Sequence, residues 1–200
     1  VDTNILLKEV LNKEYGLRKS PVLSHVAVFE IPHYHKLLLV TDAAMNIAPD
    51  VDQKIAIIKN AMSITRSFGI EEAKVALLAA KESVNEKMPA TVAAAEIVER
   101  GIEGAILAGP YALDNAVSKA SAEIKGLTSP VAGDADILLA PQIEAGNILY
   151  KSLGFLTDSR VAGTIVGASH PIVLTSRADS EDAKMNSIAL AALLAEELKE

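Results

Sequence analysis

The sequence predicts an α/β fold in which helices cover both faces of a mostly parallel β-sheet. Two observations support this prediction. Short apolar runs, typical of strands buried on both faces, alternate with segments whose apolar residues recur at helical spacing, and only short loops separate them. Such alternation indicates a parallel sheet, because parallel strands need helical crossovers. With 200 residues, 50% of them hydrophobic, the chain can bury a sizeable core.

The amino-terminal half begins with apolar residues at helical spacing, which predict a helix that starts after Thr3 or Asn4. Residues 24–31 and 36–40 are largely apolar runs typical of strands, and they are close enough in sequence to form a hairpin around Pro32. Asp50 stands directly before a helical pattern, where an N-cap is expected, and Gly69 stands where that helix should end. The first elements are therefore a helix, a hairpin and a second helix.

The carboxyl-terminal part repeats the alternation of strands and helices. Residues 74–80 are a continuous apolar run, and the helix after them should begin near Pro89 and end near Gly101. Further buried strands are expected within residues 104–110, 135–141 and 161–168. Further helices are expected within residues 111–126, 144–156 and 181–198.

Charge and composition exclude several classes of function. A net charge of -7 and a pI near 5.2 argue against nucleic acid or a membrane as partner, since both favour a basic surface. No apolar run reaches the roughly 18 residues of a membrane-spanning helix, and no signal-peptide pattern is present, so we expect a cytoplasmic protein. The lack of cysteine excludes disulfides, thiolate metal sites and a cysteine nucleophile.

The common nucleotide-binding and hydrolase motifs are missing from the sequence. It contains no G-x-G-x-x-G after a strand, no G-x-x-x-x-G-K-[ST] and no G-x-S-x-G. His33 and His35 would face the same side of an extended strand, but no third metal ligand is suggested nearby. We therefore expect a turn or sheet-edge role for them and no metal site. His25 and His170 give no stronger signal.

Polar residues that follow strands are candidates for a site, because ligands of open α/β sheets bind beyond the carboxyl ends of the strands. Asn147, Tyr150 and Lys151 fall about one turn apart on a helix that starts at this end, and such a helix start with a nearby lysine can bind an anion. The alternative is a tight strand-to-helix turn with a surface lysine. Asp42 and Asn46 are either turn formers or functional loop residues.

The segment VLTSRADSEDAKMNS, residues 173–187, places Ser176 and Arg177 at the junction of a strand and the last helix. A guanidinium offers donors that match phosphate or carboxylate oxygens, and a neighbouring hydroxyl can stabilise a developing oxyanion. Asp179, Glu181 and Asp182 could act as bases, or these acids and Ser180 could cap the helix and favour its first turn.

Five ordered segments of the chain resemble the phosphate acetyltransferase and phosphate butyryltransferase family, most closely its butyryltransferase branch. They are LSHVAVFE, TDAAMNIAPD, VALLAA, SPVAGDADILLAPQIEAGNILYK and LTSRADSEDAKMNSIALAA. The resemblance implies the two-domain fold of isocitrate and isopropylmalate dehydrogenases, with an amino-terminal part absent from this chain. It places residues 1–20 and 163–200 in the first domain and residues 21–162 in the second, with a cleft between them, and it implies a homodimer.

The same resemblance implies that a short acyl group, butyryl or branched-chain, is transferred between CoA and phosphate. A Ser-Arg pair at the matching place belongs to the family's active site. Ser176 would therefore stabilise an oxyanion or thiolate, and Arg177 would hold phosphate or acyl phosphate. Asp182 matches the family's proposed thiol base with a gap of one residue, whereas the ungapped match is Ala183.

The resemblance also implies a substrate-binding set. Thr3 and Lys8 match a phosphate-proximal Thr and Arg of the family, and a lysine keeps the charge without bidentate geometry. Asn147, Lys151 and Asp179 complete the predicted substrate-binding set, but they enter it through their positions after strands, as described above. The partners implied are acyl-CoA and inorganic phosphate, with CoA as a substrate and no tightly bound cofactor. The alternatives are a phosphate acetyltransferase, a non-catalytic relative that binds acyl phosphate or CoA, and an NAD-dependent decarboxylating dehydrogenase of the same fold.

Overall fold

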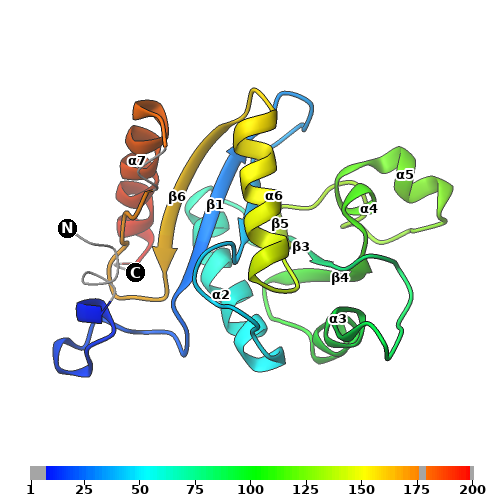
Figure 1. Ribbon diagram of the computed structural model, residues 1–200, viewed down its shortest axis with the longest axis horizontal. Coiled ribbons are helices and arrows are strands. Elements are labelled where there is room, and N and C mark those ends of the chain that lie inside the picture. The colour runs from blue at the N-terminus through cyan, green and yellow to red at the C-terminus, as the bar shows by residue number, and fades with distance from the viewer. Residues whose placement is uncertain (1–7, 176–178, 199–200) are drawn as a thin grey trace.

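A computed structural model describes residues 8–175 and 179–198, apart from the side chain of Lys13. Six strands form one sheet in the order β4-β3-β5-β2-β1-β6 (Figure 1). The strands are β1 (Ser24–Glu30), β2 (Leu38–Thr41), β3 (Ala73–Leu78), β4 (Ala105–Tyr111), β5 (Ile137–Leu139) and β6 (Arg160–Val166). The helices are η1 (Lys13–Tyr15), α2 (Val51–Ser67), α3 (Pro89–Arg100), α4 (Leu113–Val117), α5 (Lys119–Ile124), α6 (Ile143–Leu156) and α7 (Glu181–Glu197).

The pairing of the strands confirms the mostly parallel sheet. β4 pairs with β3, β3 with β5 and β5 with β2 in parallel, whereas β1 runs antiparallel to both β2 and β6. The hairpin expected from the two apolar runs is β1–β2. β4 and β6, both predicted as buried strands, form the two edges of the sheet and are only partly buried: the last four residues of β6 are buried, whereas the first three residues of β4 are half-buried.

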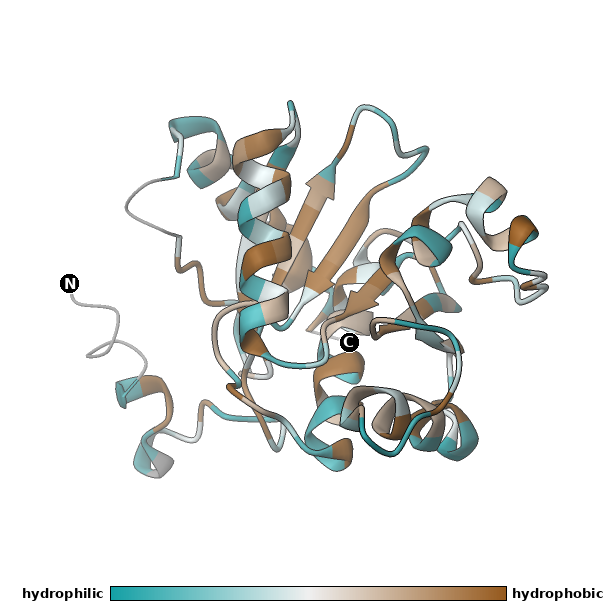
Figure 2. Cartoon of the chain, turned by 45° about the vertical axis from the view of Figure 1, so that its right-hand side comes forward, coloured by the Kyte–Doolittle hydropathy of each residue, from teal (hydrophilic) through white to brown (hydrophobic). Residues whose placement is uncertain are grey.

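Two hydrophobic clusters, one on each face, hold helices against the sheet and confirm the predicted layers. Alternate strand residues such as Val75 and Leu77 pack with α2, α3 and α7 on one face. Their neighbours, such as Ala76, pack with α4 and α6 on the other. Figure 2 shows the central strands as hydrophobic through their length, which is what burial on both faces requires. α7 lies along the β6 edge of the sheet (Figure 1).

The ends of α2 lie where the sequence predicts them. The side chain of Asp50 accepts a hydrogen bond from the backbone N–H of Gln53 at 2.8 Å, and the backbone N–H of Asp50 donates to Gln53 Oε1 at 3.0 Å. This reciprocal capping box satisfies two N–H groups that a helix start leaves unpaired. The helix ends at Ser67, and Gly69 follows with a φ of 77°, a conformation that favours glycine.

The single helix expected within residues 111–126 is a wrong prediction, because the segment forms two short helices. Ser118 lies between α4 and α5 in an extended conformation, and its side chain accepts a hydrogen bond from the N–H of Ser121. A serine that caps a new helix competes with continuation of the old one. None of the described helices is both long and apolar enough to cross a membrane.

The expected domain boundary at residue 163 falls inside β6, which pairs with β1 along its whole length. α7 packs on β6 and on α2. The division of the chain into residues 1–20 with 163–200, and 21–162, stays a prediction.

An ion-pair cluster fixes the loop that leads into β5. The carboxylate of Asp134 forms ion pairs with Lys74 Nζ, with His35 Nε2 at 2.6 Å and with Lys36 Nζ at 3.2 Å. Lys36 Nζ also pairs with the carboxylate of Asp136 at 2.7 Å. Partial burial would raise the pKa of Asp134, but the hydrogen bonds from Lys74, His35 and Lys36 outweigh it and hold that pKa well below its usual range. The cluster therefore depends on the ionised carboxylate.

Replacing Asp134 with asparagine is expected to lower the free energy of unfolding by about 1–3 kcal/mol at pH 7, because the cations that it pairs with lose a charged acceptor. A carboxyl whose pKa is depressed by folding stabilises the protein fully above its unfolded pKa of about 3.9, and the effect is lost as the pH falls below it. Urea unfolding should therefore give a difference between the two proteins that is constant above about pH 5 and shrinks below pH 4. The control is Asp158→Asn, an exposed carboxylate, and an equal effect in both variants would contradict the prediction.

Candidate active site

A polar cavity of about 220 Å³ lies between α6, β1 and β6. Six residues give it polar or aromatic walls: His25, Asn147, Tyr150, Lys151, Thr175 and Asp179. Three of them, Asn147, Lys151 and Asp179, belong to the predicted substrate-binding set, so the structure brings together residues that lie up to 32 positions apart in the sequence.

A second cavity of about 260 Å³ adjoins the first, since Tyr150 and Asp179 line both. It contains Asp182, which lies in the first turn of α7 and is exposed. Ser180 caps this helix, with its side chain accepting a hydrogen bond from the N–H of Ala183 at 3.1 Å. The capping role expected of the residues before α7 is therefore filled by Ser180.

The wall formed by the loop after β2 is held by its own polar side chains. The carboxylate of Asp42 accepts hydrogen bonds from the backbone N–H groups of Ala44, Met45 and Asn46 at 2.9 to 3.2 Å. The amide of Asn46 donates to the carbonyl oxygen of Leu23 at 2.8 Å. Between the two roles left open for Asp42 and Asn46, these bonds favour the structural one.

Asn147 joins this loop to α6. Its Nδ2 donates to the carbonyl oxygen of Ala43 at 3.0 Å, while the residue also lines the polar cavity. The helix comes close to the loop because residue 146 is a glycine: a Cβ there would overlap the carbonyl oxygen of Asp42 and lie 3.1 Å from the Cβ of Ala140. Gly146 therefore sets the position of the helix that presents Asn147 and Lys151.

Lys151 supplies the positive charge of the cavity. Its Nζ lies 5.2 Å from the ring centroid of Tyr150 and 5.4 Å from that of Phe155, a separation at which aromatic faces attract a cation. Within the described part of the chain, no carboxylate forms an ion pair with it. A half-buried ammonium with aromatic support, and with no ion pair among the residues that the structure describes, suits an incoming anion.

His25 lines the cavity, although its sequence pattern gave no functional signal. It is 8% exposed, and its ring meets the ring of Tyr150 edge to face with 5.7 Å between centroids. Among the described residues its Nδ1 is buried without a hydrogen-bond partner. Burial lowers the pKa of the imidazole, Lys151 acts in the same direction, and Asp42 and Asp179 oppose it. His25 is consequently neutral at pH 7.

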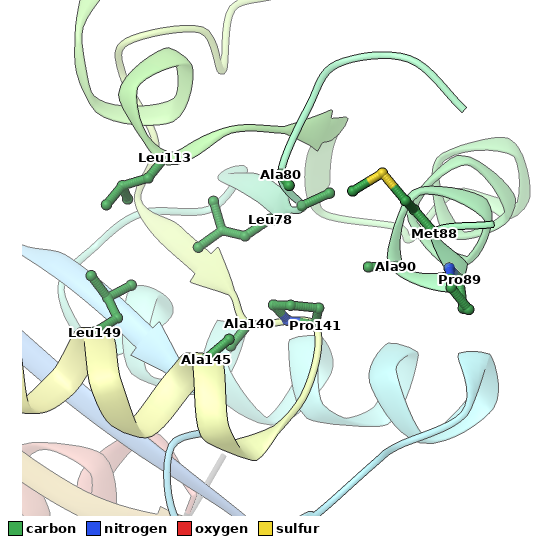
Figure 3. Close-up of a pocket in the computed structure, with 11 residues that line it drawn as sticks. Leu78, Ala80, Met88, Pro89, Ala90, Leu113, Ala140, Pro141, Ala145 and Leu149 are labelled. Carbon is green, nitrogen blue, oxygen red and sulfur yellow. The ribbon is translucent and has the colours of Figure 1, made fainter. Parts of the chain in front are cut away.

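A larger cavity of about 490 Å³ lies on the other side of α6, beyond the carboxyl ends of β3 and β5. Figure 3 shows Ala145 and Leu149 pointing into it from α6, with Leu78 and Met88 among the residues opposite. Among the described residues its lining contains no charged side chain, so it offers a phosphate no ion-pair partner. The smaller polar cavity is therefore the better candidate for chemistry on anions.

The other predicted site residues are not among the described residues that line the polar cavity. Thr3, Ser176 and Arg177 lie outside the described residues. Thr175 and Asp179, which flank the Ser-Arg pair in the sequence, both line the polar cavity. Lys8 is exposed and lines neither of the two polar cavities. Within residues 8–175 and 179–198, no group of three or more metal-ligating side chains could hold an ion.

Comparison with known proteins agrees with the resemblance seen in the sequence. A family model described as "Phosphate acetyl/butaryl transferase" matches residues 2–192. The chain is 51% identical over 199 residues to the phosphate butyryltransferase of Clostridium acetobutylicum, covering 98% of this chain and 66% of that relative. It is 47% identical over 199 residues to the phosphate acetyltransferase of Thermotoga maritima, covering 98% and 68%.

A solved structure gives the same result for the fold. The branched-chain phosphotransacylase from Enterococcus faecalis V583 superposes with a TM-score of 0.91 at 43% identity, covering 98% of this chain and 71% of that one. The chain spans about two thirds of the length of the curated relatives it matches. From the matched residues and the shared fold, this chain belongs to the phosphate acetyl/butyryl transferase family.

Proposed function

We propose that the protein containing this chain transfers a short acyl group between CoA and inorganic phosphate, with butyryl or a branched-chain acyl group preferred. The observation that supports this most strongly is the polar cavity lined by Asn147, Lys151 and Asp179. Thr175, the residue before Ser176 in the sequence, lines the same cavity. A relative 51% identical is named a phosphate butyryltransferase, and the structural relative is named a branched-chain phosphotransacylase. The acetyl group is the second candidate, because a relative 47% identical is named a phosphate acetyltransferase.

The proposed mechanism is direct transfer while both substrates are bound. The CoA thiol loses its proton, its sulfur attacks the carbonyl carbon of the acyl phosphate, and the bond from that carbon to the phosphate oxygen breaks. Arg177 and Lys151 offset the charge of the phosphate, and Ser176 stabilises the oxyanion on the acyl carbon. Asp182 is the predicted base. Because the sulfur belongs to CoA, the lack of cysteine in the chain is compatible with this chemistry.

The proposal also covers the cofactor, the partners, the oligomeric state and the location of the protein. CoA acts as a substrate, and no tightly bound cofactor is needed for the steps above. Acyl-CoA and phosphate are the proposed partners. The homodimer and the cytoplasmic location stay predictions, as do the phosphate-binding roles of Thr3 and Lys8.

Thiol release from butyryl-CoA, measured on the natural full-length protein with and without phosphate, tests this function. We expect release that requires phosphate, and Arg177→Ala should lower the rate about 10²- to 10³-fold, the cost of removing one donor to a developing charge. Arg66→Ala is the matched control, because Arg66 pairs with Glu197 at the surface. Release that is independent of phosphate would indicate a hydrolase, and equal rates for Arg177→Ala and the unaltered protein would remove Arg177 from the mechanism.

A further inference from the structure

His25 is a buried histidine in the candidate active site to which the mechanism above gives no role. It lies on β1 and faces α6, where Tyr150 packs against its ring. Although it is only 8% exposed, it lines the same cavity as Asn147 and Lys151. The ring therefore forms part of the cavity wall while most of it is shielded from bulk water.

The imidazole has an unused hydrogen-bonding nitrogen. Among the described residues, Nδ1 of His25 is buried and accepts or donates no hydrogen bond. Leaving a buried polar atom unpaired costs free energy, so such an atom in a native structure calls for an explanation, and a catalytic role is one. The acidic neighbour Asp42 does not supply it, since its carboxylate is occupied by the N–H groups of its own loop.

The strand beside His25 is shaped to accommodate the ring. A Cβ at Gly163 of β6 would lie 3.1 Å from Nε2 of His25, closer than side chains normally pack. Gly163 does not have the positive φ that would itself call for glycine. The requirement for a glycine here therefore comes from the space that the imidazole occupies.

The charged groups around His25 leave it able to accept a proton. Lys151 and Tyr150 face it from α6, Asp42 from the loop after β2, and Asp179 from the segment before α7. Burial has the largest influence and lowers the pKa of the imidazole below its ordinary 6.5. The ring is thus neutral at pH 7, the form in which an imidazole can accept a proton.

We propose that His25 is the general base that takes the thiol proton of CoA in this site, an assignment that rests on the proposed acyl transfer. The S–H proton moves to the imidazole, and the sulfur forms a bond to the acyl carbon. The bond between that carbon and the phosphate oxygen breaks, its electron pair leaves with phosphate, and the imidazolium returns the proton to phosphate. In the reverse direction the imidazolium protonates the departing CoA thiolate.

The competing base, Asp182, lies in a different environment. It is exposed and lines the second cavity, whereas the cavity with Lys151 and Asn147 has His25 in its wall. In the proposed site Lys151 binds the phosphate, and the thiol of CoA must lose its proton close to that phosphate. The base is therefore expected in the cavity that contains Lys151.

The test measures kcat/KM for CoA with butyryl phosphate as acyl donor from pH 5 to 9, using the natural full-length protein and its His25→Gln variant. The unaltered protein should lose activity on the acid side with an apparent pKa below 6.5, as the base becomes protonated. His25→Gln should lower kcat about 10²- to 10⁴-fold, remove this acid limb and leave KM for butyryl phosphate nearly unchanged. Thermal melting of both proteins separates loss of a base from loss of the fold.

Gly163→Ala supplies a second variant that keeps the imidazole and displaces it. Its new methyl group should shift the ring by a few tenths of an ångström, and we expect kcat to fall about tenfold while the acid limb stays. If His25→Gln keeps the acid limb, or if Asp182→Asn removes it, the assignment of His25 is overturned and the acyl transfer stands. If the unaltered protein forms no butyryl-CoA from butyryl phosphate or acetyl-CoA from acetyl phosphate, the proposed function itself is overturned.

Discussion

Lys151→Met should lower kcat/KM for phosphate about 10²- to 10³-fold in the direction that consumes acyl-CoA. Methionine keeps most of the length and apolar surface of the lysine stem, so the packing on Tyr150 and Phe155 is largely retained while the charge is removed. The loss should appear chiefly as a higher KM for phosphate if Lys151 binds the ground-state anion, and chiefly as a lower kcat if it acts on the charge that develops in the transition state. Initial rates at varied phosphate, with butyryl-CoA saturating, give both constants.

Lys59→Met is the matched control for this prediction. Lys59 is exposed on α2, which packs on the face of the sheet opposite α6, and the substitution changes the net charge by the same amount. Its KM for phosphate should stay within about twofold of the original, since exposed charges far from a site are screened by salt. An equal rise in KM for both variants would mean that general electrostatic attraction, and no specific contact with Lys151, accounts for phosphate binding.

The part of the site that lies on α6 could be predicted from the sequence because it depends on local geometry. Asn147 and Lys151 are four residues apart on a helix, so their side chains share a face whatever the rest of the fold does. The same argument predicts that Ala145 and Leu149 share another face, and these residues line the apolar cavity. Helical spacing thus divides α6 into a face toward the polar site and a face toward the apolar cavity.

His25 could not be predicted in the same way, because its surroundings come from pairings distant in the sequence. β6 adds to the sheet edge antiparallel to β1, with Ser24 opposite Val166, and this pairing brings Gly163 beside the imidazole. Nothing within a few residues of His25 indicates that partner. A buried-strand pattern is the same for a parallel central strand and for the inner part of an antiparallel edge strand.

The helix positions were easier to predict than the strand order for a related reason. Asp50 and Gly69 mark the ends of α2 through backbone hydrogen bonding that needs no other part of the chain. The order of six strands depends on crossovers between distant segments, and the sequence limits it only to a mostly parallel arrangement. Where local capping was overlooked, at Ser118, the predicted single helix was wrong.

Gly146→Ala is expected to lower the free energy of unfolding by about 1–3 kcal/mol, the usual effect of forcing an extra carbon into a packed site. The new Cβ would overlap the carbonyl oxygen of Asp42, a backbone atom that its own hydrogen-bonded loop holds in place, so α6 must move away from the sheet. That movement would carry Asn147 and Lys151 with it. Urea unfolding should report the loss of stability, and the KM for phosphate should rise in the folded fraction.

Gly154→Ala in the same helix distinguishes this steric effect from the intrinsic preference of helices for alanine. A Cβ at Gly154 meets no atom within 4 Å, so the substitution should raise the free energy of unfolding by about 0.5–1 kcal/mol. The two variants make the same chemical change in one helix and should shift stability in opposite directions. If both stabilise the protein, α6 is free to move relative to the loop after β2, and the close contact at Gly146 does not determine where Lys151 lies.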